Sequence, residues 1–84
     1  MVRLVFLGKL GDVAPADLAE VALPGDVKTL SDLRDWVGRT APLLGRAMAG
    51  TPTRIVLNQA VAQDMAAAIR DGDEVAFLPP MSGG

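Results

Sequence analysis

The sequence predicts a single α+β domain in which a mixed β-sheet packs against one main helix. Three observations predict this class: short apolar, strand-like segments near both ends of the chain, one segment between them with apolar residues at helical spacing, and a length of 84 residues, half of them apolar. Such a chain can build one compact core but not two. A core of this size is only marginally stable and leaves no room for a deep enclosed cavity. We therefore expect a carrier or adaptor rather than an enzyme that acts on its own.

Two short strands are expected at the start of the chain. Residues 2–7 are apolar apart from Arg3 and stop at a glycine, which is typical of a strand and too short for a helix. Residues 17–23 alternate between two sets of side chains and end at Pro24-Gly25, which indicates a second strand. We expect the two strands to pair as a hairpin, and the segment between them, with Gly11 and Pro15, to be a loop.

The main helix is expected to begin after Thr29. A Thr side chain is a good N-cap, and Asp32 at the third helical position lies near the positive end of the helix dipole. Asp is a weaker partner than Glu in a capping box, so the face of this helix is better defined than its start. Apolar residues within 43–48 predict a second, short helical turn. The residues that share one face of the main helix are Leu30, Leu33 and Val37.

The second half of the chain predicts three more extended segments. Residues 54–58 form the third strand and residues 60–63 a short one. Residues 65–69 fit either a single helical turn or an edge segment. A tight turn follows, in which Gly72 is free to take a positive φ, and residues 74–78 form the last strand.

This order of elements is that of a β-grasp, the ubiquitin-like fold, in which a mixed sheet wraps one main helix. We expect the first and last strands to be the central pair and to run parallel. Residues 1–78 then form the folded domain, and residues 79–84 form an extended C-terminal tail that ends in Gly-Gly.

The outer face of the predicted sheet is apolar. One helix covers only one face of a sheet, so the outward positions should be polar if the protein works alone. On the central strands only Arg3 is polar among them, and we interpret the face as a candidate partner-binding surface. The alternatives are a covering loop or the scattered apolar residues that every surface carries. The candidate contact residues are Val5, Leu7, Ala76 and Leu78.

The last six residues are a second candidate site. Two prolines favour a stiff, extended path and prevent further sheet pairing. Two glycines carry no side chain, so the terminal carboxyl can pass through a narrow channel of a partner. The alternative is a frayed chain end, but the position directly beyond the last strand favours a function. In order, these residues are Pro79, Pro80, Met81, Ser82, Gly83 and Gly84.

The composition excludes most other kinds of site. The chain has no Cys and no His, which removes disulfides, thiol nucleophiles, imidazole bases and the usual zinc sites, and we expect no metal. The net charge is −2 and the basic residues are scattered, which argues against a nucleic-acid partner. No apolar stretch approaches the roughly 20 residues of a membrane span, and the start lacks a leader. We expect no membrane partner and a cytoplasmic location.

Several stretches of the chain match one known family. They are the start of the helix at 29–33, the strand residues 56–58, and above all residues 71–84, which read Asp-Gly-Asp-Glu-Val-Ala-Phe-Leu-Pro-Pro-Met-Ser-Gly-Gly. With the order of elements, these stretches resemble the small, sulfur-carrier subunit of molybdopterin synthase over essentially the whole chain. Met81 departs from the Val or Ala expected there, a change that affects fit more than chemistry.

The resemblance implies a mechanism that suits a chain without Cys or His. In that family an E1-like enzyme uses ATP to adenylate the terminal carboxyl, here that of Gly84, and sulfur that comes indirectly from a sulfurtransferase converts the adenylate into a thiocarboxylate. The tail then enters the large catalytic subunit of the synthase, where the sulfur builds the dithiolene of molybdopterin on a cyclic pyranopterin. Leu78 and the outer sheet face contact that subunit. The carrier itself holds no permanent cofactor.

Two other functions are compatible with the same residues. One is a related sulfur carrier that serves thiazole or cysteine synthesis. The other is a ubiquitin-like modifier that joins Gly84 to lysines of target proteins.

Overall fold

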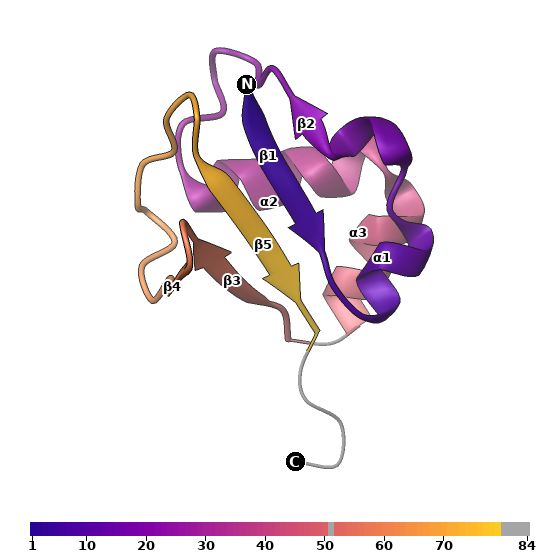
Figure 1. Cartoon of the computed structure of the whole chain (residues 1–84). Helices are drawn as coiled ribbons and strands as arrows, with labels where there is room; N and C mark the ends of the chain where they lie inside the picture. The colour runs from indigo at the N-terminus through magenta and orange to yellow at the C-terminus, as the bar shows by residue number, and fades with distance from the viewer. Residues whose placement is uncertain (51, 80–84) are drawn as a thin grey trace.

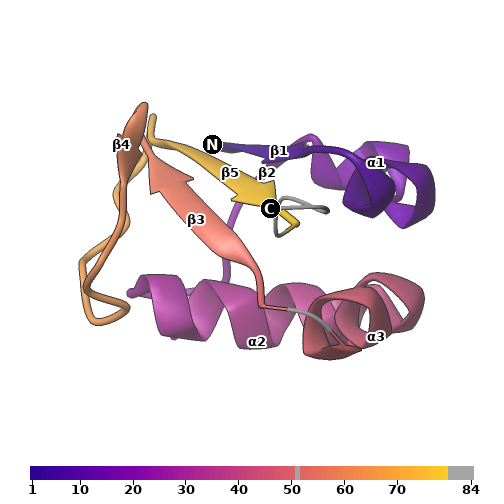
Figure 2. The same cartoon turned by 90° about the horizontal axis from the view of Figure 1, so that it is seen from below.

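The computed structural model describes residues 1–50 and 52–79. Within these residues, one sheet has the strand order β2-β1-β5-β3-β4. Helices α2 and α3 form a second layer that covers one face of this sheet, as Figures 1 and 2 show. The strands are β1 (Val2–Phe6), β2 (Glu20–Val21), β3 (Arg54–Leu57), β4 (Ala60–Val61) and β5 (Glu74–Leu78). The helices are α1 (Lys9–Val13), α2 (Leu30–Thr40) and α3 (Pro42–Gly50), with a 3-10 turn, η1, at Ala16–Leu18.

The central pair of strands has the predicted direction. β1 runs parallel to β5, from the pair Arg3 and Glu74 to the pair Phe6 and Phe77. β2 and β3 pair antiparallel on the two sides of this pair. A parallel neighbour requires a long crossover connection, and here residues 7–73, which contain all the other elements, supply it. The predicted α+β class and its β-grasp arrangement are confirmed.

The start of α2 is a capping box. The side-chain oxygen of Thr29 accepts a hydrogen bond from the amide of Asp32 at 3.1 Å. The carboxylate of Asp32 accepts one from the amide of Thr29 at 3.2 Å and one from that of Lys28 at 3.1 Å. These bonds, that of the Lys28 amide foremost, hold the pKa of Asp32 below its ordinary value. The predicted N-cap is therefore confirmed, and Asp serves here in place of Glu.

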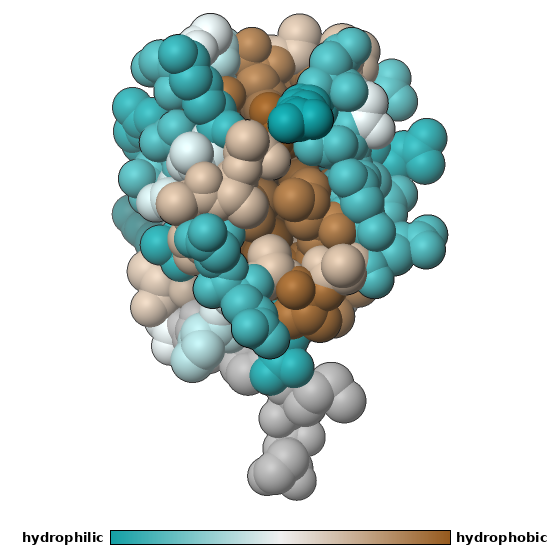
Figure 3. Space-filling model, turned by 90° about the vertical axis from the view of Figure 1, so that its left-hand side faces the viewer, coloured by the Kyte–Doolittle hydropathy of each residue, from teal (hydrophilic) through white to brown (hydrophobic). Residues whose placement is uncertain are grey.

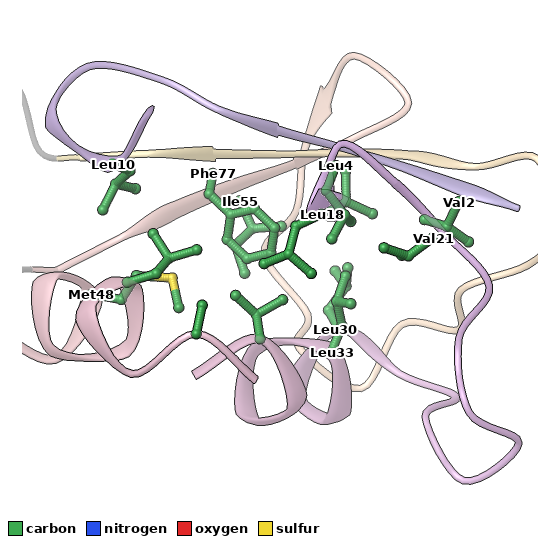
Figure 4. Close-up of a cluster of buried hydrophobic side chains, with 14 of the residues drawn as sticks. Val2, Leu4, Leu10, Leu18, Val21, Leu30, Leu33, Met48, Ile55 and Phe77 are labelled. Atoms are coloured by element: carbon green, nitrogen blue, oxygen red, sulfur yellow. The ribbon is translucent and has the colours of Figure 1, made fainter. Parts of the chain in front are cut away.

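The core lies between the sheet and the two helices, as Figure 4 shows. The inward residues of the central strands, Leu4, Val75 and Phe77, are buried. The ring of Phe77 also stacks on that of Phe6, with centroids 4.9 Å apart. Each large apolar side chain that is fully buried contributes about 1.5–3 kcal/mol. The helical side of the core includes Leu30, Leu33, Val37, Leu44 and Met48.

The two helices of the second layer touch backbone to backbone. A Cβ added to Gly45 of α3 would lie 2.8 Å from the carbonyl oxygen of Gly38 in α2 and 2.9 Å from its Cα. These separations leave no room for a side chain on Gly45. The expected short helical turn is thus a full helix, held close against α2.

The segment after β1 differs from the predicted loop. It contains α1, which places Leu10 in the core at 2% exposure. At the next residue, a Cβ on Gly11 would lie 2.8 Å from the carbonyl oxygen of Phe6, so the short helix folds back directly against β1. Glycine in this helix fits a close backbone approach, whereas the sequence pattern indicated a loop.

Two other segments also differ from the predictions. The second strand is shorter than the predicted 17–23, because η1 takes the first residues and buries Leu18. Residues 65–69 form no helical turn and no named strand. They lie beside the start of α2, where Ala68 forms an isolated antiparallel bridge with Thr29. The edge-segment alternative is therefore the closer one.

A hydrogen-bonded clamp joins the β3–β4 turn to the start of β5. Asn58 and Gln59 both have positive φ, 50° and 70°, as in a two-residue type I′ hairpin turn. The side chain of Asn58 accepts a bond from the amide of Glu74 at 2.9 Å and donates one to the carboxylate of Asp73 at 3.0 Å. Asp73 also accepts a bond from the amide of Arg70 at 2.7 Å. The clamp fixes the register in which β5 enters the sheet.

The clamp predicts a pH-dependent contribution to stability. The bond from the Asn58 side chain first, and then that from the Arg70 amide, lower the pKa of Asp73 below its ordinary 3.8. The stabilisation is complete above pH 3.8 and is lost as the pH falls through the folded-state pKa. We expect Asp73→Asn to reduce the free energy of unfolding by about 1 kcal/mol at neutral pH. The variant should also show a smaller decline of this free energy as the pH falls below 3.8.

Urea unfolding at several pH values measures both effects. Asp26→Asn, a change to an exposed carboxylate in the loop before α2, is the matched control and should keep the decline of the native protein. Identical pH profiles for Asp73→Asn and the native protein would contradict the role of the clamp.

Candidate functional site

An apolar row crosses four strands on the face of the sheet that points away from α2 and α3. Val5 of β1 pairs with Ala76 of β5, Ala76 with Val56 of β3, and Val56 with Val61 of β4. Directly opposed residues of neighbouring strands share a face, so the four side chains lie in one line. Val5, Ala76 and Val56 are partly exposed and Val61 is 56% exposed. The row is open to contact by another molecule.

A second set of apolar residues extends this row toward the end of β5. Leu78 is partly exposed and pairs with Arg54 of β3. Leu7 follows β1, is 43% exposed, and donates its amide to the carbonyl oxygen of Phe77 at 3.0 Å. The four residues predicted as contacts, Val5, Leu7, Ala76 and Leu78, are therefore gathered on one face. We call this face, with Val56 and Val61, the outer patch.

Charged residues border the outer patch at both ends of the strands. Arg3 and Glu74, two pairs before Val5 and Ala76 and therefore on the same face, form an exposed ion pair at 3.7 Å. Arg54 is exposed beside Leu78. Exposed pairs of this kind add little stability, but they confine the apolar surface to a band between charged rows. Such a border is typical of a protein-binding surface.

The apolar surface also continues around the edge of the sheet. Figure 3 shows a band of hydrophobic residues between hydrophilic ones on the side that carries β3, β4 and the loop after them. An open groove of about 470 Å³ lies on this edge, with Ile55, Val61, Ala62 and Met65 among its lining residues. The exposed residue Val61 thus belongs both to the outer patch and to this edge.

The sequence reasoning missed Val56 and Val61. Val56 was predictable, because it follows an inward-facing residue of a predicted strand and must point outward. Val61 was not, because its face depends on the register of the β3–β4 hairpin, which is set by the positive-φ turn at Asn58 and Gln59.

The root of the tail is held against the turn between β1 and α1. Gly8 has φ 57° and ψ −136°, a combination that only glycine adopts without strain. A Cβ on Gly8 would lie 3.0 Å from Cγ of Pro79 and 3.5 Å from its Cδ. The proline ring therefore packs on bare backbone directly after β5. The other predicted tail residues, Pro80, Met81, Ser82, Gly83 and Gly84, lie outside the described residues.

The described part of the chain offers neither a metal site nor a membrane span. In residues 1–50 and 52–79, no group of three or more acidic, His or Cys residues is placed to hold a metal ion. In the same residues, no helix is long and apolar enough to cross a membrane. The two carboxyls whose pKa is lowered, Asp32 and Asp73, are both accounted for by turn and capping hydrogen bonds.

Comparison with protein families identifies the chain. A model of the ThiS family matches residues 4–84, nearly the full length. The chain belongs to the ThiS family. It is a small, ubiquitin-like sulfur carrier. The resemblance to sulfur carriers that was inferred mainly from residues 71–84 is therefore confirmed as membership of this family. A search of curated protein sequences gives no significant match to this ThiS-family chain.

Solved structures share the fold of this ThiS-family protein. The alignment with the crystal structure of SAMP1 from Haloferax volcanii has a TM-score of 0.72 and 27% identity. It covers 99% of this chain and 98% of the SAMP1 chain. The solution structure of small archaeal modifier protein 1 from Methanosarcina acetivorans has a TM-score of 0.74 and 22% identity, with coverage of 99% and 95%. The alignment with one chain of the complex of subunits 1 and 2 of molybdopterin-converting factor from Helicobacter pylori has a TM-score of 0.62 and 24% identity. It covers 99% of this chain and 97% of that chain. The last two comparisons concern the fold alone.

The contact between Gly8 and Pro79 predicts a measurable coupling. Gly8→Ala forces a strained backbone and also presses a methyl group against the proline ring, so we expect a loss of more than about 1 kcal/mol in the free energy of unfolding. Pro79→Ala should recover part of that loss, because it removes the atoms that the methyl group meets. Urea unfolding of the two single variants and the double variant measures the coupling.

Gly72 offers the matched control. It also has a positive φ, 91°, but nothing lies within 4 Å of an added Cβ. Gly72→Ala should therefore lose on the order of 1–2 kcal/mol from backbone strain alone and show no coupling to Pro79→Ala. Additive effects of Gly8→Ala and Pro79→Ala would contradict the packing described above.

Proposed function

We propose that this ThiS-family carrier is the sulfur-donating small subunit of a molybdopterin synthase. The observation that carries the proposal is the course of β5. Its residues Ala76 and Leu78 lie in the outer patch, and the strand leads through Pro79 into the sequence that ends Gly83-Gly84. A partner that binds the outer patch is thus placed to receive the tail. The resemblance of residues 71–84 to that family supports the proposal, as does a fold shared with the molybdopterin-converting factor complex.

Activation takes place on the carboxyl group of Gly84. In the active site of an E1-like enzyme, the carboxylate attacks the α-phosphorus of ATP, pyrophosphate leaves, and an acyl adenylate forms. A sulfur nucleophile, supplied indirectly by a sulfurtransferase, then adds to the activated carbonyl, and AMP departs to leave a thiocarboxylate. The ATP belongs to the activating enzyme. This chain provides the acyl group and the surface by which it is held.

Donation takes place in the large catalytic subunit. The thiocarboxylate of Gly84 enters that subunit with the C-terminal tail, and its sulfur forms a bond to a carbon of a cyclic pyranopterin. Water then cleaves the acyl–sulfur bond and restores the carboxylate of Gly84. Two carriers in turn supply the two sulfur atoms of the molybdopterin dithiolene. A chain without Cys or His has no other conventional group on which to carry reactive sulfur. The carrier is therefore non-catalytic, and the large subunit supplies the groups that act on the pterin.

The outer patch supplies the binding free energy that the tail lacks. Two terminal glycines lose much conformational freedom when they become ordered in a channel. Burial of the apolar row and of Leu78 offsets that loss at about 25 cal/mol per Å² of apolar surface. Because Pro79 is packed against Gly8, the tail starts from a defined point beside the outer patch.

A ubiquitin-like modifier is the second candidate function. The 27% identity with SAMP1 over nearly the whole of both chains favours it. The same acyl adenylate would then lead to an isopeptide bond between Gly84 and a lysine amine, with AMP as the leaving group in the overall exchange. A carrier for thiazole or cysteine synthesis would use the same thiocarboxylate with a different acceptor.

Two variants test the donor role in a reconstituted synthase. Deletion of Gly84 should abolish sulfur transfer to the pterin, because no acyl group remains at the required position. Leu78→Asp should weaken binding to the large subunit by about tenfold or more, because it places a charge in the apolar contact next to the root of the tail. Leu43→Asp is the matched control, since Leu43 is 64% exposed on α3 and lies outside the outer patch.

The readouts separate the tail from the surface. Calorimetric titration measures binding, and mass spectrometry of the pterin product measures transfer. The Gly84 deletion should bind within about twofold of the native protein, while Leu43→Asp should change neither quantity. Sulfur transfer by the truncated chain would refute the donor role. Equal binding by Leu78→Asp and Leu43→Asp would refute the outer patch as the docking surface.

A further inference from the structure

Three arginines line one groove on the helical side of the molecule. Arg34 and Arg39 belong to α2 and Arg46 to α3, and all three side chains are exposed. The groove is open, has a volume of about 1170 Å³, and includes Asp35 as its acidic member. Most of its other described lining residues are glycine, proline or alanine. We call this feature the arginine groove.

The packing of the two helices creates the arginine groove. The side of α2 that carries Leu33 and Val37 is buried in the core. Arg34, Gly38 and Arg39 therefore lie on the other sides of this helix and line the groove. Because a Cβ on Gly45 would collide with Gly38, no side chain stands between the helices there. The floor is therefore bare backbone and small residues, and the longest side chains stand on the rim.

The three guanidinium groups have no acidic partner within the described residues. The ion pairs there involve the N-terminus with Asp71 and Arg3 with Glu74. Arg39 donates from Nε to the backbone carbonyl oxygen of Asp35 at 3.3 Å, which leaves its other donors free. Three of the eight basic residues of a chain with net charge −2 are thus gathered in one place.

We propose that the arginine groove is a docking site for an acidic segment of a protein partner, in which Asp or Glu side chains flank one or two apolar residues. Guanidinium groups bind carboxylates in a planar, two-bonded geometry. The small, apolar floor accepts apolar side chains between them. A nucleic acid fits less well, because Asp35 stands in the groove and three arginines neutralise few phosphates on an otherwise acidic chain.

The position of the arginine groove makes this contact independent of the outer patch. Most residues that line the groove belong to α2 and α3. These helices lie on the other side of the core from the outward face of the sheet (Figure 2). An acidic partner segment can therefore hold the carrier while the outer patch and the tail are engaged elsewhere. The inference holds whichever acceptor takes sulfur from Gly84.

Binding of a defined peptide tests the arginine groove. The probe is a short fluorescent peptide of glutamates and leucines, and its reference is the same peptide with glutamine in place of every glutamate. Fluorescence anisotropy with the native full chain should show binding of the glutamate peptide that weakens as salt increases. The triple variant Arg34→Glu, Arg39→Glu and Arg46→Glu should lose about tenfold or more in affinity.

A second triple variant controls for overall charge. Lys9→Glu, Lys28→Glu and Arg70→Glu change the net charge by the same amount at exposed positions away from the groove, and should lose less than about twofold in affinity. If circular dichroism shows that the groove variant is unfolded, the milder triple change of Arg34, Arg39 and Arg46 to Gln replaces it, with the same expected order of affinities.

Three results would overturn the proposal. They are equal loss of affinity in the two triple variants, equal binding of the glutamate and glutamine peptides, and tighter groove-dependent binding of a single-stranded oligonucleotide than of the glutamate peptide. Leu78→Asp should leave binding of the peptide unchanged, and a matching loss in that variant would likewise contradict a separate surface.

Discussion

The parallel pairing of β1 with β5 is the interaction on which the rest of the structure depends. It joins the two ends of the domain, so every other element belongs to the crossover between them or packs on it. Its register places Val5 beside Ala76, and the bond from Leu7 to Phe77 carries the pairing to the end of β5. This one strand pair thus determines the positions of the core residues, of the outer patch and of Pro79. It forms only when distant parts of the chain meet.

The two faces of the sheet differ in burial. Inward residues such as Val75 and Phe77 are fully buried under the helices, whereas Ala76 and Leu78 between and beside them stay accessible. The strict alternation of a strand makes this division possible in five residues. A domain of this size has little stability to spare. Its core therefore takes one whole face of the central strands and leaves the other face to the outer patch.

The central elements were predictable from the sequence because local and long-range preferences agree there. β5, the capped start of α2 and the turn at Gly72 each have a pattern with one physical reading. The short elements were not, because their structure follows from packing: Leu10 enters the core although Gly11 indicates a loop, and β2 is shortened because Leu18 is buried by a 3-10 turn. At the site, the sequence indicated the faces of the central strands, but the contact between Gly8 and Pro79 requires the folded chain.

The intact mass of the protein purified from its own host tests the central claim, that Gly84 carries sulfur. Tandem mass spectrometry of the C-terminal fragment locates any change. The account predicts a population whose mass is increased by the difference between one oxygen and one sulfur atom, with the change confined to Gly84. A population that contains only the free carboxylate and isopeptide conjugates to lysine, under conditions in which the host makes its sulfur-containing cofactors, would contradict it.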